Sequence, residues 1–254
     1  MVRLSVNVNK VATLRNARGG RSPSVLDAVK VCIDAGAPGI TVHPRADQRH
    51  ITPGDVREIA ALLKGVRPHV EYNIEGDPRP DLIALVHEVQ PDQCTLVPVL
   101  PGEITSQAGW QPGPATERVA EVARELRSRG IRVSLFVDAV PDCMAWAAAS
   151  GADRVELYTE PFARAFAEHG AGGQEVRRAL ATYVEAARAA HALGLGVNAG
   201  HDLDLDNLPA FLEVPFLDEV SIGHAIMSRA LFAGLATVVG EYLRVLKSRP
   251  QNRA

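Results

Sequence analysis

Short apolar runs alternate with longer segments of helical periodicity along the whole chain. Eight runs, rich in valine, isoleucine and leucine, have the length and character of buried strands. They are residues 4–8, 39–43, 70–75, 94–99, 132–138, 154–159, 196–200 and 219–223. Strict alternation of strand and helix favours a parallel sheet with right-handed crossovers. Eight such units in 254 residues predict an α/β protein with the (β/α)₈ TIM barrel fold.

A doubly wound open sheet is the competing interpretation. That fold usually carries a glycine-rich fingerprint after its first strand, and residues 9–23, NKVATLRNARGGRSP, contain no GxGxxG. No composition shift marks a domain boundary, so we expect a single barrel domain over residues 1–254. The least regular piece is PFARAFAEHGAGGQ, residues 161–174, where we expect a mobile loop.

Two helices carry clear signals. In residues 52–65, Thr52 suits the N-cap, Pro53 the first helical position and Asp55 the capping-box partner, while Gly65 suits the C-terminal cap. Residues 114–130 place charges on one face and valine, alanine and leucine on the other, as an amphipathic helix does.

Composition narrows the class of protein. The net charge is −3, so no global basic field indicates nucleic-acid binding. The three cysteines, Cys32, Cys94 and Cys143, have no metal or redox spacing and predict buried thiols in a reducing compartment. No signal-peptide pattern and no apolar stretch long enough for a membrane span occurs, so we expect a soluble, cytoplasmic protein with no membrane partner.

Polar and titratable residues lie where most of the predicted strands end. In a TIM barrel the active site lies at the C-terminal ends of the strands, so these residues should converge on one face. They are Asn7, Asn9, Lys10, His43, Arg45, Asn73, Glu75, Asp138, Glu156, Thr159, Asn198, His201 and His224. A barrel without a catalytic site needs no such collection.

The ends of strands seven and eight share a Gly-His pair, in NAGHD and SIGHA. Gly223 and His224 directly precede a helical segment, and backbone N–H groups at a helix N-terminus bind phosphate. Loops after strands seven and eight often form the phosphate site of this fold. The alternative is that both glycines are only turn residues, and we favour the phosphate site because position and chemistry agree.

A second anion site is indicated by Arg18, Arg45 and His50, which follow strands one and two. Arginine holds phosphate oxygens with a planar fork. We therefore expect a substrate set with two phosphate groups, or with one phosphate and another anion.

Three groups remain for proton transfer: His43, Glu75 and His201. Histidine gives or takes a proton near neutral pH, and a carboxylate in an apolar mouth has a raised pKa. The same three groups would also suit a metal site, and the residues alone leave that interpretation open.

The chain resembles the pyridoxine 5′-phosphate synthase family in NVNKVATLRNARGG, GITVHPRADQRHI, NIEG, NAGHDL and SIGHAI, in order along its length. The resemblance implies a (β/α)₈ barrel that assembles into a homo-octamer. It implies condensation of 1-deoxy-D-xylulose 5-phosphate with 3-amino-2-oxopropyl phosphate, which yields pyridoxine 5′-phosphate, inorganic phosphate and water. It implies no metal and no organic cofactor.

The resemblance also implies a role for each site residue. General acid–base catalysis falls to His43, Glu75 and His201. The aminoketone phosphate would be bound by Asn7, Arg18, the backbone at Asp202, and Gly223 with His224. The deoxyxylulose phosphate falls to Asn9, Lys10, Arg45, His50 and Thr105. The two histidines of HPRADQRHI would therefore do different work, His43 as proton acceptor and His50 as phosphate ligand.

Two positions depart from the commoner family pattern. Asn9-Lys10 stands where Asp-His is commoner, which keeps a donor and adds a permanent charge. Val99-Leu100-Pro101 stands where many relatives carry charged residues. Two other functions stay open from the residues: a metal-dependent sugar-phosphate epimerase or aldolase on the same barrel, and a protein that binds phosphorylated metabolites without turnover.

Overall fold

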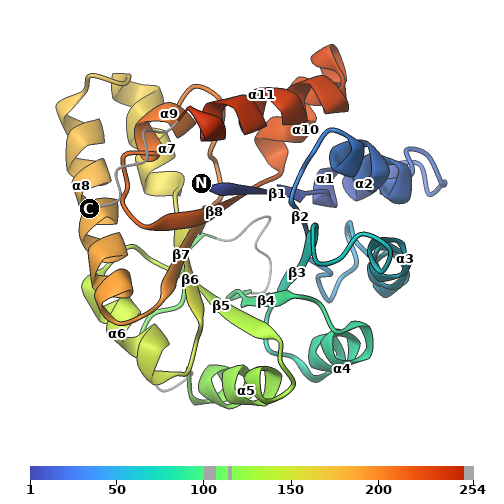
Figure 1. The fold of residues 1–254 in the computed structure, drawn as a ribbon, viewed down its shortest axis with the longest axis horizontal. Coiled ribbons are helices and arrows are strands. Elements are labelled where there is room, and N and C mark those ends of the chain that lie inside the picture. The colour runs from blue at the N-terminus through green and yellow to red at the C-terminus, as the bar shows by residue number, and fades with distance from the viewer. Residues whose placement is uncertain (100–106, 114–115, 249–254) are drawn as a thin grey trace.

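Eight parallel strands close into a barrel in the order of the chain (Figure 1). The computed structural model describes residues 1–99, 107–113 and 116–248. The strands are β1 (Arg3–Asn7), β2 (Gly39–Val42), β3 (Glu71–Gly76), β4 (Gln93–Leu96), β5 (Arg132–Val137), β6 (Arg154–Tyr158), β7 (Gly196–Gly200) and β8 (Leu217–Ile222). β8 pairs with β1 and closes the ring. The predicted TIM barrel and all eight predicted strands are confirmed.

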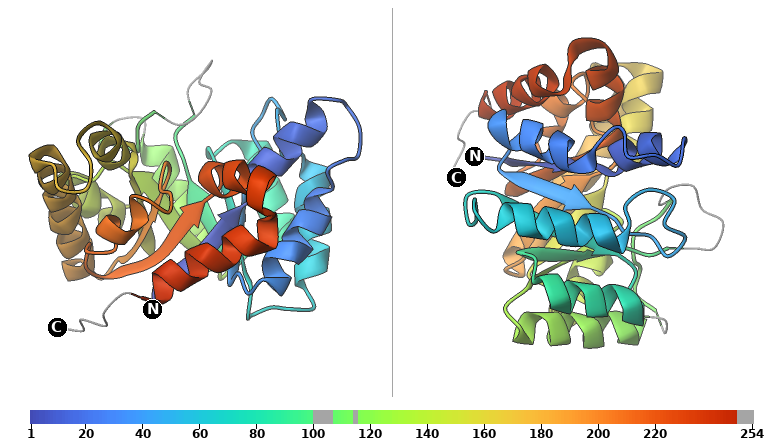
Figure 2. Two further views of the ribbon diagram at one scale, coloured as in Figure 1. Left: turned by 90° about the horizontal axis from the view of Figure 1, so that it is seen from above. Right: turned by 90° about the vertical axis from the view of Figure 1, so that its right-hand side faces the viewer.

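Helices surround the barrel on the outside (Figures 1 and 2). In the described part of the chain they are α1 (Asn9–Asn16), α2 (Val25–Asp34), α3 (Pro53–Leu63), α4 (Pro80–Val89), α5 (Glu117–Ser128), α6 (Pro141–Ala149), α7 (Glu160–His169), α8 (Gln174–Ala192), α9 (Leu208–Phe211), α10 (His224–Ala233) and α11 (Leu235–Lys247). None of these helices is long and apolar enough to cross a membrane.

Two helices, instead of one, follow each of β1, β6 and β8. The first helix of each pair, α1, α7 or α10, begins two residues after its strand ends. Because the chain turns so soon, each of these helices starts at the C-terminal mouth of the barrel. Asn9 and Lys10 therefore lie in the first turn of α1 and not on the strand.

The prediction of a mobile loop at residues 161–174 is wrong, because most of this segment belongs to α7. Pro161 fits the first turn, where a missing N–H costs nothing, and Phe162 is buried against Tyr183 and Phe211. The helix ends at Gly170, which adopts a φ of +68°.

The predicted N-terminal capping box of α3 is confirmed, and the predicted C-terminal cap at Gly65 is not. The Thr52 hydroxyl accepts from the Asp55 N–H, and the Asp55 carboxylate accepts from the Thr52 N–H. The helix ends at Leu63, with Lys64 as C-cap in the right-handed conformation. Gly65 is not left-handed, so it does not form the expected cap, and the chain continues in further turns.

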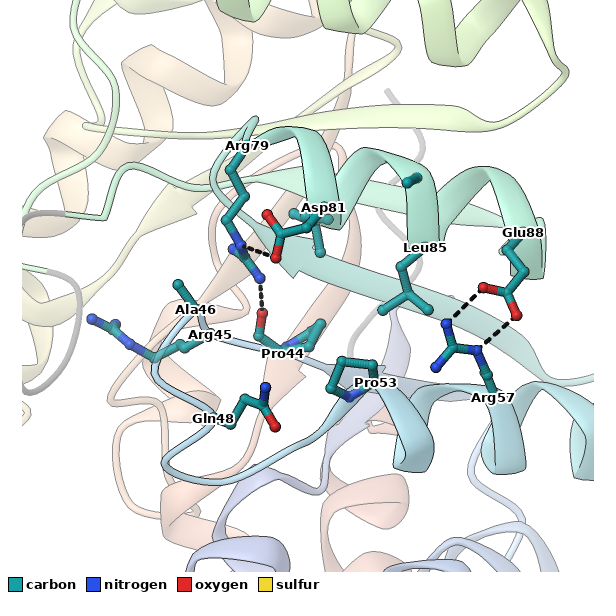
Figure 3. Close-up of a pocket in the computed structure, with 12 residues that line it drawn as sticks. Pro44, Arg45, Ala46, Gln48, Pro53, Arg57, Arg79, Asp81, Leu85 and Glu88 are labelled. Atoms are coloured by element: carbon teal, nitrogen blue, oxygen red, sulfur yellow. Dashed lines mark hydrogen bonds and ion pairs between the residues drawn. The ribbon is translucent and has the colours of Figure 1, made fainter.

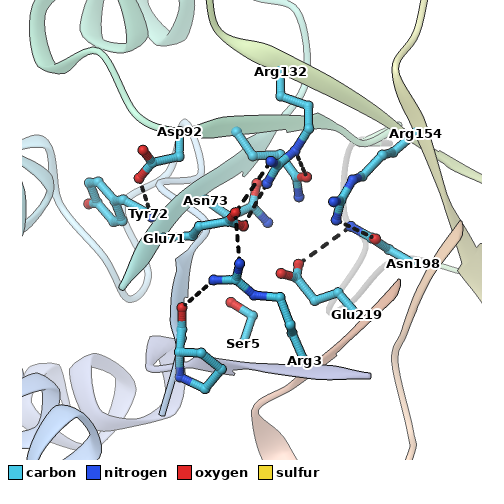
Figure 4. Close-up of polar contacts among 12 residues, drawn as sticks. Arg3, Ser5, Glu71, Tyr72, Asn73, Asp92, Arg132, Arg154, Asn198 and Glu219 are labelled. Atoms are coloured by element: carbon cyan, nitrogen blue, oxygen red, sulfur yellow. Dashed lines mark hydrogen bonds and ion pairs between the residues drawn. The ribbon is translucent and has the colours of Figure 1, made fainter. Parts of the chain in front are cut away.

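Apolar side chains fill the layer between strands and helices, while the interior of the barrel is polar. At the N-terminal ends of the strands, Glu71 pairs with Arg3 at 3.1 Å and with Arg132 at 2.6 Å (Figure 4). Arg132 also donates to Gln93 at 2.9 Å. These groups are hydrogen-bonded to one another, as buried polar groups generally are. An ionic layer therefore lies at the end of the barrel opposite to the C-terminal mouth.

The cysteines agree with the prediction. Cys32, Cys94 and Cys143 are buried and form no disulfide. Burial raises the pKa of the Cys32 and Cys94 thiols to about 12, so both are neutral and unreactive at physiological pH.

Candidate active site

A cavity of about 820 Å³ opens at the C-terminal ends of the strands. It is lined by Asn7, Asn9, Lys10, His43, Arg45, His50, Glu75, His201, Asp202, Gly223 and His224, among others. Two predicted site residues are not among the lining residues. Arg18 is exposed beyond the end of α1, and Thr105 lies outside the described residues.

Two asparagines at the end of β1 position the central acid–base groups. The Asn7 side-chain oxygen, Oδ1, accepts from the Asn9 backbone N–H at 3.0 Å, and Asn9 Oδ1 accepts from the His43 backbone N–H at 2.9 Å. The Asn7 amide donates to Glu75 Oε2 at 3.4 Å. Asn7 and Asn9 thus tie the ends of β1, β2 and β3 together.

His43 and Glu75 face each other inside the cavity. His43 Nδ1 lies 3.9 Å from Glu75 Oε2, and both side chains are about nine-tenths buried. The other ring nitrogen, Nε2, is buried and has no hydrogen-bond partner among the described residues. Burial, followed by the nearby His50 and Arg45, lowers the pKa of His43 to about 3. His43 is therefore neutral at physiological pH and can accept a proton.

The pKa of Glu75 is shifted in the opposite direction, upward. The pKa of Glu75 is raised to about 8: burial raises it, a hydrogen bond from Ser221 lowers it, and the charge of Glu219 raises it. A carboxyl group with this pKa is largely protonated at neutral pH and can donate a proton. His43 can therefore act as a proton acceptor and the neighbouring Glu75 as a proton donor. The two pKa shifts have a common cause, because a site of low polarity disfavours the charged form of each group.

Glu156 on β6 is a cavity residue to which the sequence reasoning gave no role. It is 4% exposed, its Oε2 has no partner among the described residues, and burial raises its pKa well above the usual value. A Cβ atom at Gly200 would lie 2.3 Å from Glu156 Oε1. Glycine at the end of β7 therefore makes room for this carboxyl group. The available signal was the position of Glu156 near the end of a predicted strand.

His201 lies on a tight loop after β7. His201 and Asp202 have φ angles of +83° and +59°, in the region that disfavours most side chains. His201 Nδ1 lies 2.7 Å from Asp202 Oδ2, a hydrogen bond that lowers the pKa of Asp202. Asn207 holds the loop by donating to the Asp202 carbonyl at 3.0 Å. Strain of this kind persists where the surrounding structure holds it, often at functional sites.

His50 is held as a neutral donor. Its Nδ1 accepts from the Ile51 N–H at 2.9 Å, which leaves the proton on Nε2. Burial, then the charges of Arg45 and Lys10, lowers the pKa of His50 to about 4. Its ring centre lies 6.2 Å from that of His43. The two histidines therefore share one cavity in different hydrogen-bonding states.

Two arginines outside the predicted set hold the loop that carries His43 and His50. Arg15 on α1 pairs with Asp55 at 2.9 Å and donates to the His50 carbonyl at 3.3 Å. Arg79 pairs with Asp77. It also donates to the Pro44 carbonyl (Figure 3). The residue of TLRNAR that turns inward is thus Arg15 and not Arg18.

Figure 3 also shows a smaller pocket of about 290 Å³ between α3 and α4. Its charges pair with one another: Arg57 with Glu88 at 2.7 Å, and Arg79 with Asp81 at 3.1 Å. The Arg57–Glu88 pair joins α3 to α4, whereas Arg79 and Asp81 both lie at the start of α4.

Gly223 has a steric reason to be glycine. A Cβ atom there would lie 2.9 Å from both the Cβ and the carbonyl oxygen of Asn7. Gly223, His224 and Ala225 line the cavity at the start of α10, so the backbone of this helix N-terminus borders the cavity. The glycine therefore serves the approach of β8 to β1, and the helix start is placed as the phosphate-site prediction required.

Further charged residues complete the rim. Arg49 Nε donates to Asp47 Oδ2 at 2.7 Å. On α7, Arg164 Nε lies 3.3 Å from Glu160 Oε1. Arg49, Glu160 and Arg164 line the cavity and were not predicted. Among the described residues, no group of three or more His, Cys, Asp or Glu side chains is arranged to hold a metal ion.

The raised pKa of Glu75 predicts a pH-dependent stability. Its pKa lies near 8 in the folded protein and near 4.5 when the carboxyl is solvated, so the folded state binds the extra proton between these values. The contribution of Glu75 to the free energy of unfolding should fall by a few kcal/mol as pH rises from about 4.5 to about 8, while His43 and His50, with pKa values lowered to about 3 and about 4, contribute a rise up to about pH 6.5. Glu75→Gln removes that titration and should flatten the fall. Urea unfolding across this pH range measures it.

Glu58→Gln, on the exposed side of α3, is the matched control and should keep the wild-type slope. A wild-type slope in Glu75→Gln as well would show that the Glu75 carboxyl is not the titrating group.

Comparison with known proteins gives the family. The family model described as pyridoxal phosphate biosynthesis protein PdxJ matches residues 4–248. A pyridoxine 5′-phosphate synthase of Bacteroides thetaiotaomicron is 50% identical over 97% of this chain and 100% of that protein. One of Leptospira biflexa is 48% identical over 97% of each chain.

Solved structures with the same fold are more distant in sequence. Thiamine phosphate pyrophosphorylase from Pyrococcus furiosus superposes with a TM-score of 0.62 at 15% identity, over 97% of this chain and 96% of that one. Phosphoribosyl anthranilate isomerase from Thermotoga maritima gives 0.61 at 16% identity, over 97% and 99%. At these identities the likeness concerns the barrel alone. The full-length relatives decide the family, and the chain belongs to the PdxJ family of pyridoxal phosphate biosynthesis enzymes.

Proposed function

We propose that the protein condenses 1-deoxy-D-xylulose 5-phosphate with 3-amino-2-oxopropyl phosphate to form pyridoxine 5′-phosphate, inorganic phosphate and water. The observation that carries the proposal is the close approach of neutral His43 and largely protonated Glu75, 3.9 Å apart, in a cavity whose β8–β1–β2 side carries Lys10, Arg45 and the N-terminus of α10. The relatives from Bacteroides thetaiotaomicron and Leptospira biflexa, which are pyridoxine 5′-phosphate synthases, support it.

The reaction needs repeated proton transfers, because an amine adds to a ketone, water and phosphate leave, and a ring becomes aromatic. His43 takes a proton through its unpartnered Nε2, and Glu75 gives one from its protonated carboxyl. His201 and its Asp202 partner supply a further acid–base group from the opposite side of the mouth. Each positioned acid or base contributes about 10²–10⁴-fold to the rate.

Two anion sites bind the two substrates and orient them relative to each other. Lys10, Arg45 and His50, with the Asn9 amide, bind the deoxyxylulose phosphate on the β1–β2 side, and Thr105 is assigned to the same phosphate. The backbone of Asp202 and of Gly223–His224, with Asn7, binds the aminoketone phosphate at the start of α10. Arg18 joins this site when the segment after α1 approaches the cavity. Holding two reactants together contributes orientation as well as affinity.

The assay that tests the proposal uses the purified protein and both phosphorylated substrates. We expect pyridoxine 5′-phosphate by chromatography and mass spectrometry, and no product when either substrate is omitted. We propose that no metal or organic cofactor is needed, so turnover should persist after treatment with a chelator. Chelator-sensitive turnover with stoichiometric zinc or manganese would favour a metal-dependent epimerase or aldolase. Tight binding of both substrates without product would favour a metabolite-binding protein.

Substitution should separate the acid–base groups from the binding groups. Glu75→Gln, His43→Asn and His201→Asn should each lower kcat by about 10²-fold or more, with smaller changes in substrate affinity. Arg45→Ala and His50→Ala should mainly weaken binding of the deoxyxylulose phosphate, because a phosphate contact acts on ground and transition states alike. Steady-state kinetics and calorimetric titration of each substrate measure the two effects.

Two controls accompany these variants. His69→Asn, at an exposed histidine far from the cavity lining, should turn over at the wild-type rate. Lys10→His restores the commoner family residue and should keep measurable activity. Wild-type turnover in Glu75→Gln would remove Glu75 from the mechanism. Loss of turnover with normal binding in His50→Ala would exchange the roles of the two histidines.

We propose that the protein assembles into a homo-octamer, as the family resemblance implies. Leu231 and Phe232 near the end of α10 are 71% and 93% exposed in the single chain, and burial of such side chains supports association. Light scattering should give the mass of eight chains. A monomer at micromolar concentration would contradict the proposed assembly.

A further inference from the structure

A small apolar cluster lies at the mouth of the barrel, separate from the main core. It consists of Val97 after β4, Phe136 on β5 and Tyr158 at the end of β6. Val97 and Phe136 line the catalytic cavity, and the Phe136 and Tyr158 rings lie 5.5 Å apart. We call Val97 and Phe136 the apolar wall. Each of the two residues is only 4% exposed, and the part of its side chain that borders the cavity is carbon, whereas most strand ends at the mouth carry polar groups.

The topology places the apolar wall across the barrel from the cationic residues. In a closed ring of eight strands, β5 lies opposite β1 and β4 lies opposite β8. Lys10 follows β1 and Arg45 follows β2, while Gly223 follows β8. A substrate whose phosphate is bound on that side therefore directs its far end toward β4 and β5.

The wall is fixed from behind, so it presents a constant surface. The Trp110 N–H donates to the Phe136 carbonyl at 2.8 Å, and the Trp110 indole donates to the Leu96 carbonyl at 3.0 Å. On its other side, the Tyr158 ring lies 5.3 Å from the ring of His201. The wall is thus continuous with the acid–base groups.

We infer that the apolar wall of Val97 and Phe136 determines specificity by receiving the C1 methyl group of a 1-deoxyketose 5-phosphate. The inference rests on the proposed function. In 1-deoxy-D-xylulose 5-phosphate the methyl group is the end of the molecule farthest from the phosphate. D-Xylulose 5-phosphate differs only in a hydroxyl at that carbon, and neither Val97 nor Phe136 has a side-chain group to bond with it. An apolar pocket discriminates against such an added hydroxyl by about 10²-fold.

The test compares the two ketose phosphates in the condensation with 3-amino-2-oxopropyl phosphate. Wild-type kcat/KM should be about 10²-fold higher for the 1-deoxy sugar. Any product from D-xylulose 5-phosphate is recognised by mass as heavier by one oxygen atom. Val97→Thr keeps the shape of the side chain and adds a hydroxyl, so the preference should narrow by about tenfold. Phe136→Tyr is a second variant with the same expected direction. Val97→Ala keeps the wall apolar and should keep the preference, whatever its absolute rate.

The outcomes separate this inference from the function on which it rests. No pyridoxine 5′-phosphate from the 1-deoxy sugar would overturn the proposed function. Product formation with equal kcat/KM for both sugars would overturn only the inferred role of the apolar wall in specificity. That comparison uses the wild-type protein alone. An unchanged preference in every folded hydroxyl-bearing variant would also overturn the wall. A large wild-type preference that narrows in Val97→Thr or Phe136→Tyr, and not in Val97→Ala, supports it.

Discussion

The arrangement of the mouth depends on a buried carboxyl group that has no cation among its hydrogen-bonding partners in the described part of the chain. Glu75 ends β3 inside the barrel, and its described hydrogen-bonding neighbours are an asparagine amide and a serine hydroxyl. A buried carboxylate without a compensating charge is expensive, so the group holds its proton. The same low polarity keeps His43 in its neutral form. One physical condition, exclusion of water from a polar cavity, therefore prepares both a proton donor and a proton acceptor.

The scaffold maintains this condition from both ends of the barrel. Toward the N-terminal ends of the strands, Arg3 and Arg132 pair with Glu71. At the C-terminal ends, the chain adds a helix after β1, β6 and β8, and each added helix begins at the mouth. These helices contribute the rim of the cavity and the N-terminus that borders Gly223. The strands thus position the acid–base groups, while the added helices supply the sites for charged ligands.

The cavity has chemically distinct sides. Lys10, Arg45 and the N-terminus of α10 lie around β8, β1 and β2, and the apolar wall of Val97 and Phe136 lies at β4 and β5. A ligand with a phosphate at one end and a methyl group at the other is complementary to that division. The distant barrels of similar fold share the architecture at about 15% identity, so the family's chemistry resides in these side chains and not in the barrel.

The sequence by itself determined the strands, the barrel and most of the site. Apolar runs of strand length recur eight times, and parallel strands bring their C-terminal ends to one face, so His43, Glu75 and His201 had to meet there. The N-terminal capping box of α3 was also readable, because Thr52 and Asp55 interact within one turn. Local pattern is sufficient wherever the decisive contacts are close in sequence or imposed by strand direction.

Tertiary structure decided the rest. The helix at residues 160–169 was missed because its stability comes from Phe162 packing on Tyr183 and Phe211, contacts distant in sequence. Arg15 and not Arg18 turns inward because Asp55 lies within reach of it. The sequence placed Glu156 near a strand end, but only the structure shows that Gly200, which has no side chain, leaves room for its carboxyl group. Each of these depends on which atoms become neighbours after the barrel closes, and no spacing along the chain specifies that.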